Sequence, residues 1–195
     1  MKRLLISTSL ATSVLLPSAA LAQAAPAAVI AIVDLEKVTS QCNACKTASA
    51  ALRAQATAEE NRERALVAPL QTEQRSIQAA IDALAGKEPD AALKARVQAF
   101  QAKQQQAQET ASNGRQQLQA NQQYIQKQIA DKLGPIYTQV MQRRGANIMV
   151  EIGQTLASSA GLDVSNDVVT ALNVALPSVQ AVAPVQPRPQ TPQGR

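Results

Sequence analysis

The segment AGKEPD, residues 85–90, decides the fold that the sequence predicts. Gly86 and Pro89 lie close together in it, and such a pair ends one helix and lets another begin. Long stretches on either side are rich in Ala, Gln, Leu, Lys, Arg and Glu, which are strong helix formers. Two helices joined by so short a loop fold back as an antiparallel hairpin. We therefore expect a helical hairpin arm over residues 46–144, with its tip at residues 85–90.

The second predicted helix carries a seam with steps that alternate between four and three residues, which is coiled-coil spacing. The seam positions are Leu93, Val97, Phe100, Gln104, Ala107, Ala111, Gly114, Leu118, Asn121 and Ile125. The first helix offers apolar residues to this seam toward the loop, namely Leu66, Leu70, Ile77, Ile81 and Leu84. Pro69 lies inside this first helix, opposite the region of Gln104, and an internal proline removes a backbone hydrogen bond. We predict an arm with a weak middle and a hinge at Pro69.

The segments that flank the arm predict a small body. AAVIAIVD, residues 27–34, is a continuous apolar run rich in Val and Ile, which is typical of a buried strand. ANIMVEIG, residues 146–153, and TLASSA, residues 155–160, are interpreted as two further short strands. A final helix follows in residues 163–177, with Ser165 as its N-cap.

The predicted fold class is thus α+β. A small β-rich oligomerisation body, formed by both chain ends over residues 27–45 and 145–177, has the helical hairpin inserted into it. A body of this size is small for a stable core, so we expect an oligomer to complete its sheet.

The two ends of the chain have compositions of their own. A basic start, an apolar run and the small residues Ala20-Leu21-Ala22 predict a secretory signal peptide over residues 1–22, with cleavage after Ala24 or Ala25 as alternatives. In a Gram-negative cell the exported protein would reach the periplasm, where disulfides persist. Residues 178–195 are rich in Pro and Gln, and we expect them to be disordered.

The charge is mild, which argues against binding to nucleic acid. The formal net charge is +5, and it falls to +3 when Lys2 and Arg3 leave with the signal peptide (5 − 2 = 3). Basic residues near the tip could attract acidic proteins, anionic lipid or lipopolysaccharide weakly. They are Arg75, Lys87, Lys94, Arg96 and Lys103. The chain has no His and no catalytic constellation, so we expect neither an enzyme nor a cofactor.

The two cysteines, Cys42 and Cys45, stand in the segment QCNACKT, residues 41–47. A zinc site needs about four ligands, and the chain has too few. Haem attachment would need His at position 46, where Lys stands. A thiol oxidoreductase would use the low thiol pKa at a helix start, but no thioredoxin-like framework surrounds the pair. A local disulfide or a buried thiol pair at the base of the arm is the remaining interpretation.

The chain resembles the Skp/OmpH family of periplasmic chaperones over residues 29–176. AIVDLEKV, residues 31–38, is similar to the family's opening strand and turn. IMVEIGQTLASSAGLDVSNDVVTALN, residues 148–173, is similar to its closing hairpin and last helix. Ser165 stands where the family usually has Thr. The arm departs from the clearly basic arms of the family, because residues 53–132 hold eleven Lys or Arg against nine Asp or Glu.

The resemblance implies a homotrimer, with helical arms that extend from a central hub and hold unfolded outer-membrane proteins between them without ATP. A structural coiled-coil adaptor of the cell envelope, binding one folded partner, is the first alternative. A thiol oxidoreductase is the second.

Overall fold

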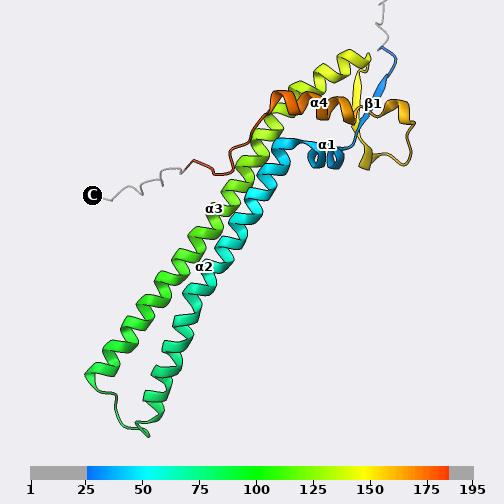
Figure 1. The fold of residues 1–195 in the computed structure, drawn as a ribbon. Coiled ribbons are helices and arrows are strands. Elements are labelled where there is room, and N and C mark those ends of the chain that lie inside the picture. Colours follow the sequence, from blue (N-terminus) through cyan, green and yellow to red (C-terminus); the bar gives the residue numbers. More distant parts are fainter. Residues whose placement is uncertain (1–25, 185–195) are drawn as a thin grey trace, which may run out of the picture.

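The computed structural model describes residues 26–184. The predicted signal peptide and the last residues of the predicted disordered tail lie outside this range. Two long antiparallel helices, α2 (Asn43–Asp82) and α3 (Ala91–Arg144), project from a small body at one end of the molecule (Figure 1). With 40 and 54 residues, the helices are about 60 and 80 Å long. The hairpin arm predicted from the sequence is therefore present.

The turn at the tip is built where the sequence places it. Helix α2 ends at Asp82, and Ala85 and Gly86 then adopt positive φ angles of 47° and 88°. Asp90 caps α3, because its carboxylate accepts a hydrogen bond of 2.8 Å from the Leu93 amide. At its other end α3 stops at Gly145, whose φ of 65° is the left-handed conformation that commonly ends helices.

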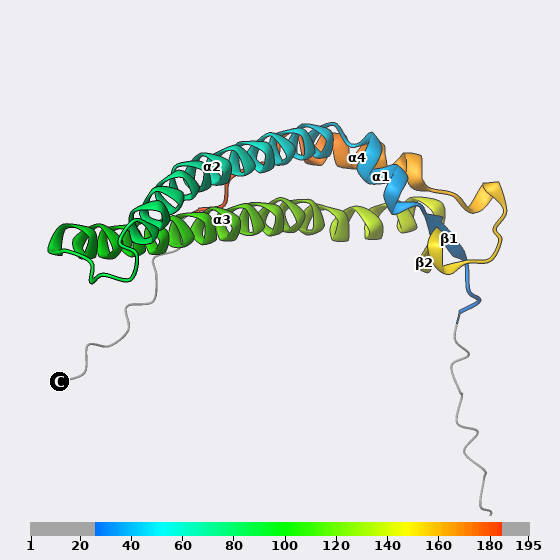
Figure 2. The ribbon, with the colours of Figure 1, turned by 90° about the horizontal axis from the view of Figure 1, so that it is seen from below.

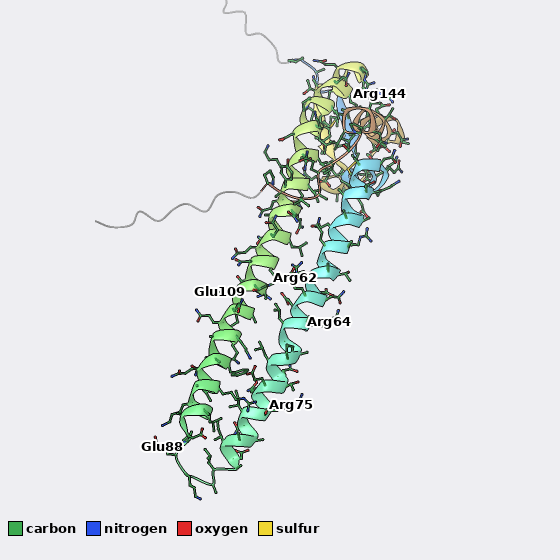
Figure 3. All side chains as sticks on the ribbon, turned by 60° about the vertical axis from the view of Figure 1, so that its left-hand side comes forward. Arg62, Arg64, Arg75, Glu88, Glu109 and Arg144 are labelled. Carbon is green, nitrogen blue, oxygen red and sulfur yellow. A yellow bond between two sulfur atoms is a disulfide. The ribbon has the colours of Figure 1, made fainter. Side chains whose placement is uncertain are left out.

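The arm begins three residues earlier than position 46, because Cys42 caps α2 and the helix starts at Asn43. Pro135 lies inside α3, which continues to Arg144. Seen from below, α2 curves along its length (Figure 2). Side chains project from both helices over their whole length, with the labelled Arg64 and Arg75 on α2 and Glu109 on α3 (Figure 3).

The body combines residues from before and after the arm. Strand β1 (Ile30–Val33) pairs in parallel with β2 (Ile148–Glu151), with Ile30 opposite Ile148. Helix α1 (Leu35–Gln41) follows β1, and helix α4 (Ser165–Ala175) lies against the base of α3. Two 3₁₀ turns, η1 (Ile152–Gln154) and η2 (Ala160–Leu162), connect β2 to α4.

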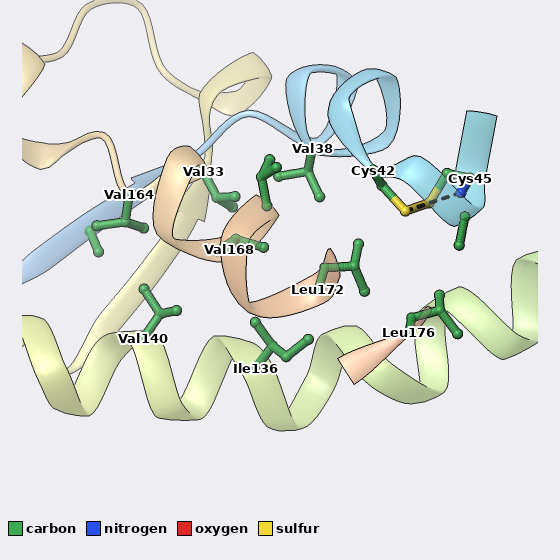
Figure 4. Close-up of a cluster of buried hydrophobic side chains, with 13 residues drawn as sticks. Val33, Val38, Cys42, Cys45, Ile136, Val140, Val164, Val168, Leu172 and Leu176 are labelled. Carbon is green, nitrogen blue, oxygen red and sulfur yellow. Dashed lines mark hydrogen bonds between the residues drawn. A yellow bond between two sulfur atoms is a disulfide. The ribbon is translucent and has the colours of Figure 1, made fainter. Parts of the chain in front are cut away.

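The core of the body is small and aliphatic (Figure 4). Its most buried large side chains are Val38 of α1, Val140 of α3, and Val168 and Leu172 of α4, all 0% exposed. Val33 and Ile136 complete the contact between the strand and the arm base. The elements on both sides of the arm are thus held together by one apolar cluster.

Two predicted features of the body are wrong. TLASSA forms no strand, because residues 155–159 lie between η1 and η2 without regular secondary structure and Leu156 is fully exposed. A strand needs a partner edge, and within residues 26–184 the sheet has only β1 and β2. Helix α1 stands in the part of the body where no helix was expected; Asp34 caps it by accepting a 2.8 Å hydrogen bond from the Lys37 amide.

The expected disorder of the tail is also wrong for residues 178–184. These residues lie along the base of the arm, and hydrogen bonds join them to side chains of both arm helices. In Figure 1 this segment leaves the end of α4 and crosses α3. The sequence could not show this because the Pro- and Gln-rich segment has no helix or strand pattern, whereas its contacts are made with distant residues.

Candidate functional site

The seam predicted for α3 is the surface that meets α2. Phe100, Asn121 and Ile125 are buried, and the other seven predicted seam positions are half-buried, so the heptad spacing is confirmed. On α2, Ile77 is buried, while Ile81 is 39% exposed and contributes less than the sequence suggested. The seam is apolar at the tip and polar in the middle.

The middle of the arm is organised around a buried carboxylate, Glu59 of α2, which is only 8% exposed. Its Oε2 accepts a hydrogen bond of 2.5 Å from Arg62, whereas its Oε1 has no hydrogen-bond partner among the described residues. Glu59 packs against Gly114 of α3, where a Cβ atom would collide with the carboxylate. A cavity of about 240 Å³ opens beside this contact. The helices are therefore loosely packed here.

Pro69 lies on the tip side of this loose stretch. The ion pairs Glu63–Arg115 and Glu73–Lys103, both 2.8 Å, bracket it. Pro69 consequently faces the part of α3 between Lys103 and Arg115, which includes the region of Gln104 that the sequence indicated.

The basic residues near the tip are scattered over the arm and partly neutralised. Lys94 pairs with Glu88 at 2.6 Å, and Lys103 pairs with Glu73. Arg96 donates a 2.8 Å hydrogen bond to Ser76, and Arg75 contacts a backbone carbonyl of its own helix. Exposed pairs of this kind contribute little to stability. The structure does not gather these residues, with Lys87, into one basic patch.

The two cysteines lie at the junction between α1 and α2, and they form a disulfide with a Cα–Cα distance of 5.1 Å (Figure 4). Cys42 is 0% exposed and Cys45 is 7% exposed. Cys42 Sγ also accepts a hydrogen bond of 3.1 Å from the Cys45 amide and so caps α2. The pair packs into the body core and fixes the start of the arm.

Ser165 does not have its predicted role. Val164 stands at the N-cap, and Ser165 is the first residue of α4. Its buried hydroxyl accepts a hydrogen bond of 2.8 Å from the Asp34 amide and donates one of 2.5 Å to Asp163. Ser165 therefore ties the end of β1 to the start of α4, a contact across 131 positions that no local pattern reveals.

Asp163 takes over much of the capping. Its Oδ1 accepts hydrogen bonds from both the amide and the hydroxyl of Ser165. These bonds, helped by Lys37, hold the pKa of Asp163 below its ordinary value. Nearby, a 2.6 Å ion pair with Asp167 raises the pKa of Arg144 and connects the end of α3 to α4.

Three arm amides bind the backbone of residues 178–184, and of these the sequence indicated only Asn121, as a seam position. The side-chain oxygen of Gln128 accepts a hydrogen bond of 3.0 Å from the backbone N–H of Gln180, and its NH₂ group donates one of 2.9 Å to the backbone carbonyl of Gln180. Gln55 donates to the Ala181 carbonyl at 3.1 Å. Asn121 accepts from the Ala183 amide at 2.9 Å.

These residues could not be found from the sequence because glutamine is common along the whole arm. The one available signal was Asn121, a polar residue at a seam position. Among residues 26–184, no group of three or more His, Cys, Asp or Glu side chains could hold a metal ion. Nor does any helix in that range have the length and apolar character needed to cross a membrane.

The fold and the arm define a class of protein in which a small α/β body carries one long antiparallel helical hairpin. The sequence places the chain within it more narrowly. Residues 29–172 match the family described as Outer membrane protein (OmpH-like), and the chain belongs to this family.

A solved structure from Caulobacter crescentus CB15, described as an OmpH-like outer membrane chaperone, shares the fold with a TM-score of 0.65. The alignment covers 80% of this chain and 90% of that one at 16% sequence identity, so this likeness concerns the fold alone. No curated protein matches the chain.

Proposed function

We propose that this protein is an ATP-independent holdase chaperone of the periplasm. It would bind unfolded outer-membrane proteins and prevent their aggregation without catalysing a reaction. Membership of the OmpH-like family supports this proposal. The observation that carries it is the long arm with a loosely packed, polar middle.

The arm has the properties that a holdase needs. A folded partner would require a preformed, well-packed surface, whereas an unfolded chain offers many weak contacts. Around Glu59 the seam holds Ala111, Gly114 and Asn121 at positions where tightly packed coiled coils have large apolar side chains. Helices held in this way can shift apart to fit clients of different sizes, and the hinge proposed at Pro69 would add to this freedom.

A homotrimer would turn separate arms into a cavity. The body exposes apolar side chains around its sheet: Ile30 is 42% exposed, Ile148 42% and Leu156 108%. A two-stranded sheet is marginal alone. Asp163 bridges to Ile32 on β1, whereas the outer edge of β2 pairs with no other strand among the described residues and could pair with another chain. We propose that this edge and these side chains form the contact between subunits.

The alternatives find less support. A reactive cysteine is partly exposed, whereas Cys42 and Cys45 are buried in the core and joined in a disulfide. An oxidoreductase would reduce insulin, and Cys42→Ser would abolish that activity. Because the basic residues near the tip are dispersed and partly paired, contact with anionic lipid or lipopolysaccharide would be weak.

The deciding experiment dilutes a urea-denatured outer-membrane β-barrel into buffer without nucleotide and follows light scattering. The protein should suppress the scattering, while an equal mass of a folded periplasmic protein should not. If the barrel aggregates equally in both samples, the holdase proposal fails and the structural adaptor becomes the better account.

A further inference from the structure

The hydrogen bonds between the arm and residues 178–184 are unusual in their targets. Four of them join an arm side chain to a backbone N–H or C=O of the segment. One contact involves a side chain of the segment, that from the Tyr124 hydroxyl to the Gln180 amide oxygen at 3.1 Å. Recognition of this kind reads the polypeptide backbone and not the identity of the residues.

The three amides are arranged as a short ladder. The Gln128 amide both donates to and accepts from Gln180, as the backbone of a neighbouring strand would. Asn121, 5% exposed, donates a 2.8 Å hydrogen bond to the Gln55 oxygen and so orients the Gln55 NH₂ group toward the segment. Because these side chains support one another, the site is held ready on the arm.

The segment presents its side chains in alternation. Val179, Ala181 and Ala183 are half-buried, whereas Gln180, Val182 and Pro184 are exposed. This period of two is that of an extended chain. The small side chains of Ala181 and Ala183 allow the backbone to approach the arm closely, and any extended chain with small residues at alternate positions could do the same.

The site also offers an unused acceptor. The segment runs from Gln128 toward Asn121, in the direction of the tip. The 240 Å³ cavity lies next to it on the same path, bounded by Gln55, Asn121 and Val182 and reaching to Glu59. The buried Glu59 Oε1, which lacks a partner among the described residues, could accept a hydrogen bond from a backbone N–H there.

We propose that Gln55, Asn121 and Gln128 form a binding site for an extended polypeptide backbone. Residues 178–184 occupy it in the free protein, and segments of unfolded clients displace them. The last step rests on the proposed function, whereas the peptide site itself does not. The tail would thus cover the site until a client arrives.

The test uses the full chain with a released tail. Gln180→Pro with Ala183→Pro removes both backbone donors, while proline suits an extended chain. The probe is a fluorescein-labelled peptide with the sequence of residues 178–184, followed by fluorescence anisotropy. The release variant should bind it at least about tenfold more tightly than the parent, in which the tethered tail competes at high effective concentration.

Two controls make the result specific. Adding Gln55→Ala and Gln128→Ala to the release variant should weaken peptide binding about tenfold or more, since hydrogen bonds to the backbone are lost. Adding Gln119→Ala and Gln123→Ala, at exposed positions of α3, should leave it unchanged. A peptide methylated on the nitrogens that correspond to Gln180 and Ala183 should bind no variant. If the release variant binds the peptide equally well with either pair of alanine substitutions, the proposed site is wrong.

The client step is tested separately in the light-scattering assay. The release variant should protect a denatured barrel at lower concentration than the parent, and Gln55→Ala/Gln128→Ala should protect less well. If the parent and this alanine variant protect equally, clients do not use the site. If no variant protects, the holdase proposal and the client step fail together, while the peptide titration still decides whether the site exists.

Discussion

Gly114 is a position at which the absence of a side chain shapes the arm. It leaves room for the Glu59 carboxylate inside the helix pair, and a Cβ atom there would collide with it. Glycine in a helix costs about 1 kcal/mol relative to alanine, so its presence at a seam position needs a local reason. The buried glutamate is that reason.

We therefore predict that Gly114 and Glu59 are energetically coupled. Gly114→Ala should stabilise the chain by about 1 kcal/mol when Glu59→Ala is already present, because only the gain in helix propensity remains. In the parent, the same change should give a smaller gain or a loss, since the carboxylate must move. Urea unfolding of the four variants measures the coupling. Equal effects in both backgrounds would contradict it.

Asp163 should make the free energy of unfolding depend on pH. Its pKa is lower in the folded chain than in the unfolded chain, because Ser165 donates two hydrogen bonds to the carboxylate. The unfolded state consequently binds more protons at low pH. The stability that Asp163 contributes is present above its unfolded pKa of about 3.9 and is lost as the pH falls through the lower folded value.

Asp163→Asn should thus reduce the free energy of unfolding at pH 6. The difference from the parent should shrink below about pH 4, where the parent loses the same contribution. Chemical unfolding at several pH values tests this, with the exposed Asp131→Asn as the control. A difference that stays constant from pH 6 to pH 3 would assign the effect to shape and not to charge.

At the scale of the element, Pro69 is the proposed hinge of α2. Proline has no N–H, so the carbonyl of Ala65, one turn earlier, lacks its usual helical donor. The polar stretch beside it gives little packing to resist bending.

Pro69→Ala should raise the thermal midpoint of the arm, because an internal proline costs a helix about 3 kcal/mol relative to alanine. It should also narrow the range of clients protected, since a stiffer arm adjusts less. The measurement is light scattering with one small and one large denatured barrel, and Thr72→Ala serves as the matched helix control. Unchanged protection of both clients would rule out the hinge.

At the scale of the whole molecule, the small body leaves several large apolar side chains exposed. They include Ile30 and Ile148 of the two strands and Leu156 of the stretch between η1 and η2, which is the most exposed of them. Exposed apolar residues that gather in this way mark contact surfaces.

Leu156→Asp should consequently weaken or abolish the proposed homotrimer, because a charge would be placed in an apolar interface. Sedimentation analysis over a range of protein concentrations would measure the change, and Val67→Asp on the arm is a control at another exposed apolar position. A variant with the mass of the parent assembly at every concentration would place the contact elsewhere.

The arm was determined by the sequence alone. Helix propensity, the heptad spacing from Leu93 to Ile125 and the glycine and proline of residues 85–90 are all local signals. Each acts within a few residues, so the helices, their seam and their turn could be predicted without knowing what they contact. The position of Cys42 and Cys45 at the arm base followed in the same way.

The tertiary structure decided the features that join distant parts of the chain. The hydroxyl of Ser165 accepts a hydrogen bond from the Asp34 amide, and the stretch around Leu156 forms no strand. The side-chain amides of Gln55 and Gln128 bind the backbone of residues 178–184. The physical reason is that a hydrogen bond or a strand pairing depends on which partner comes within about 3 Å in space. A polar side chain can satisfy that requirement at many places, and only the folded chain selects one.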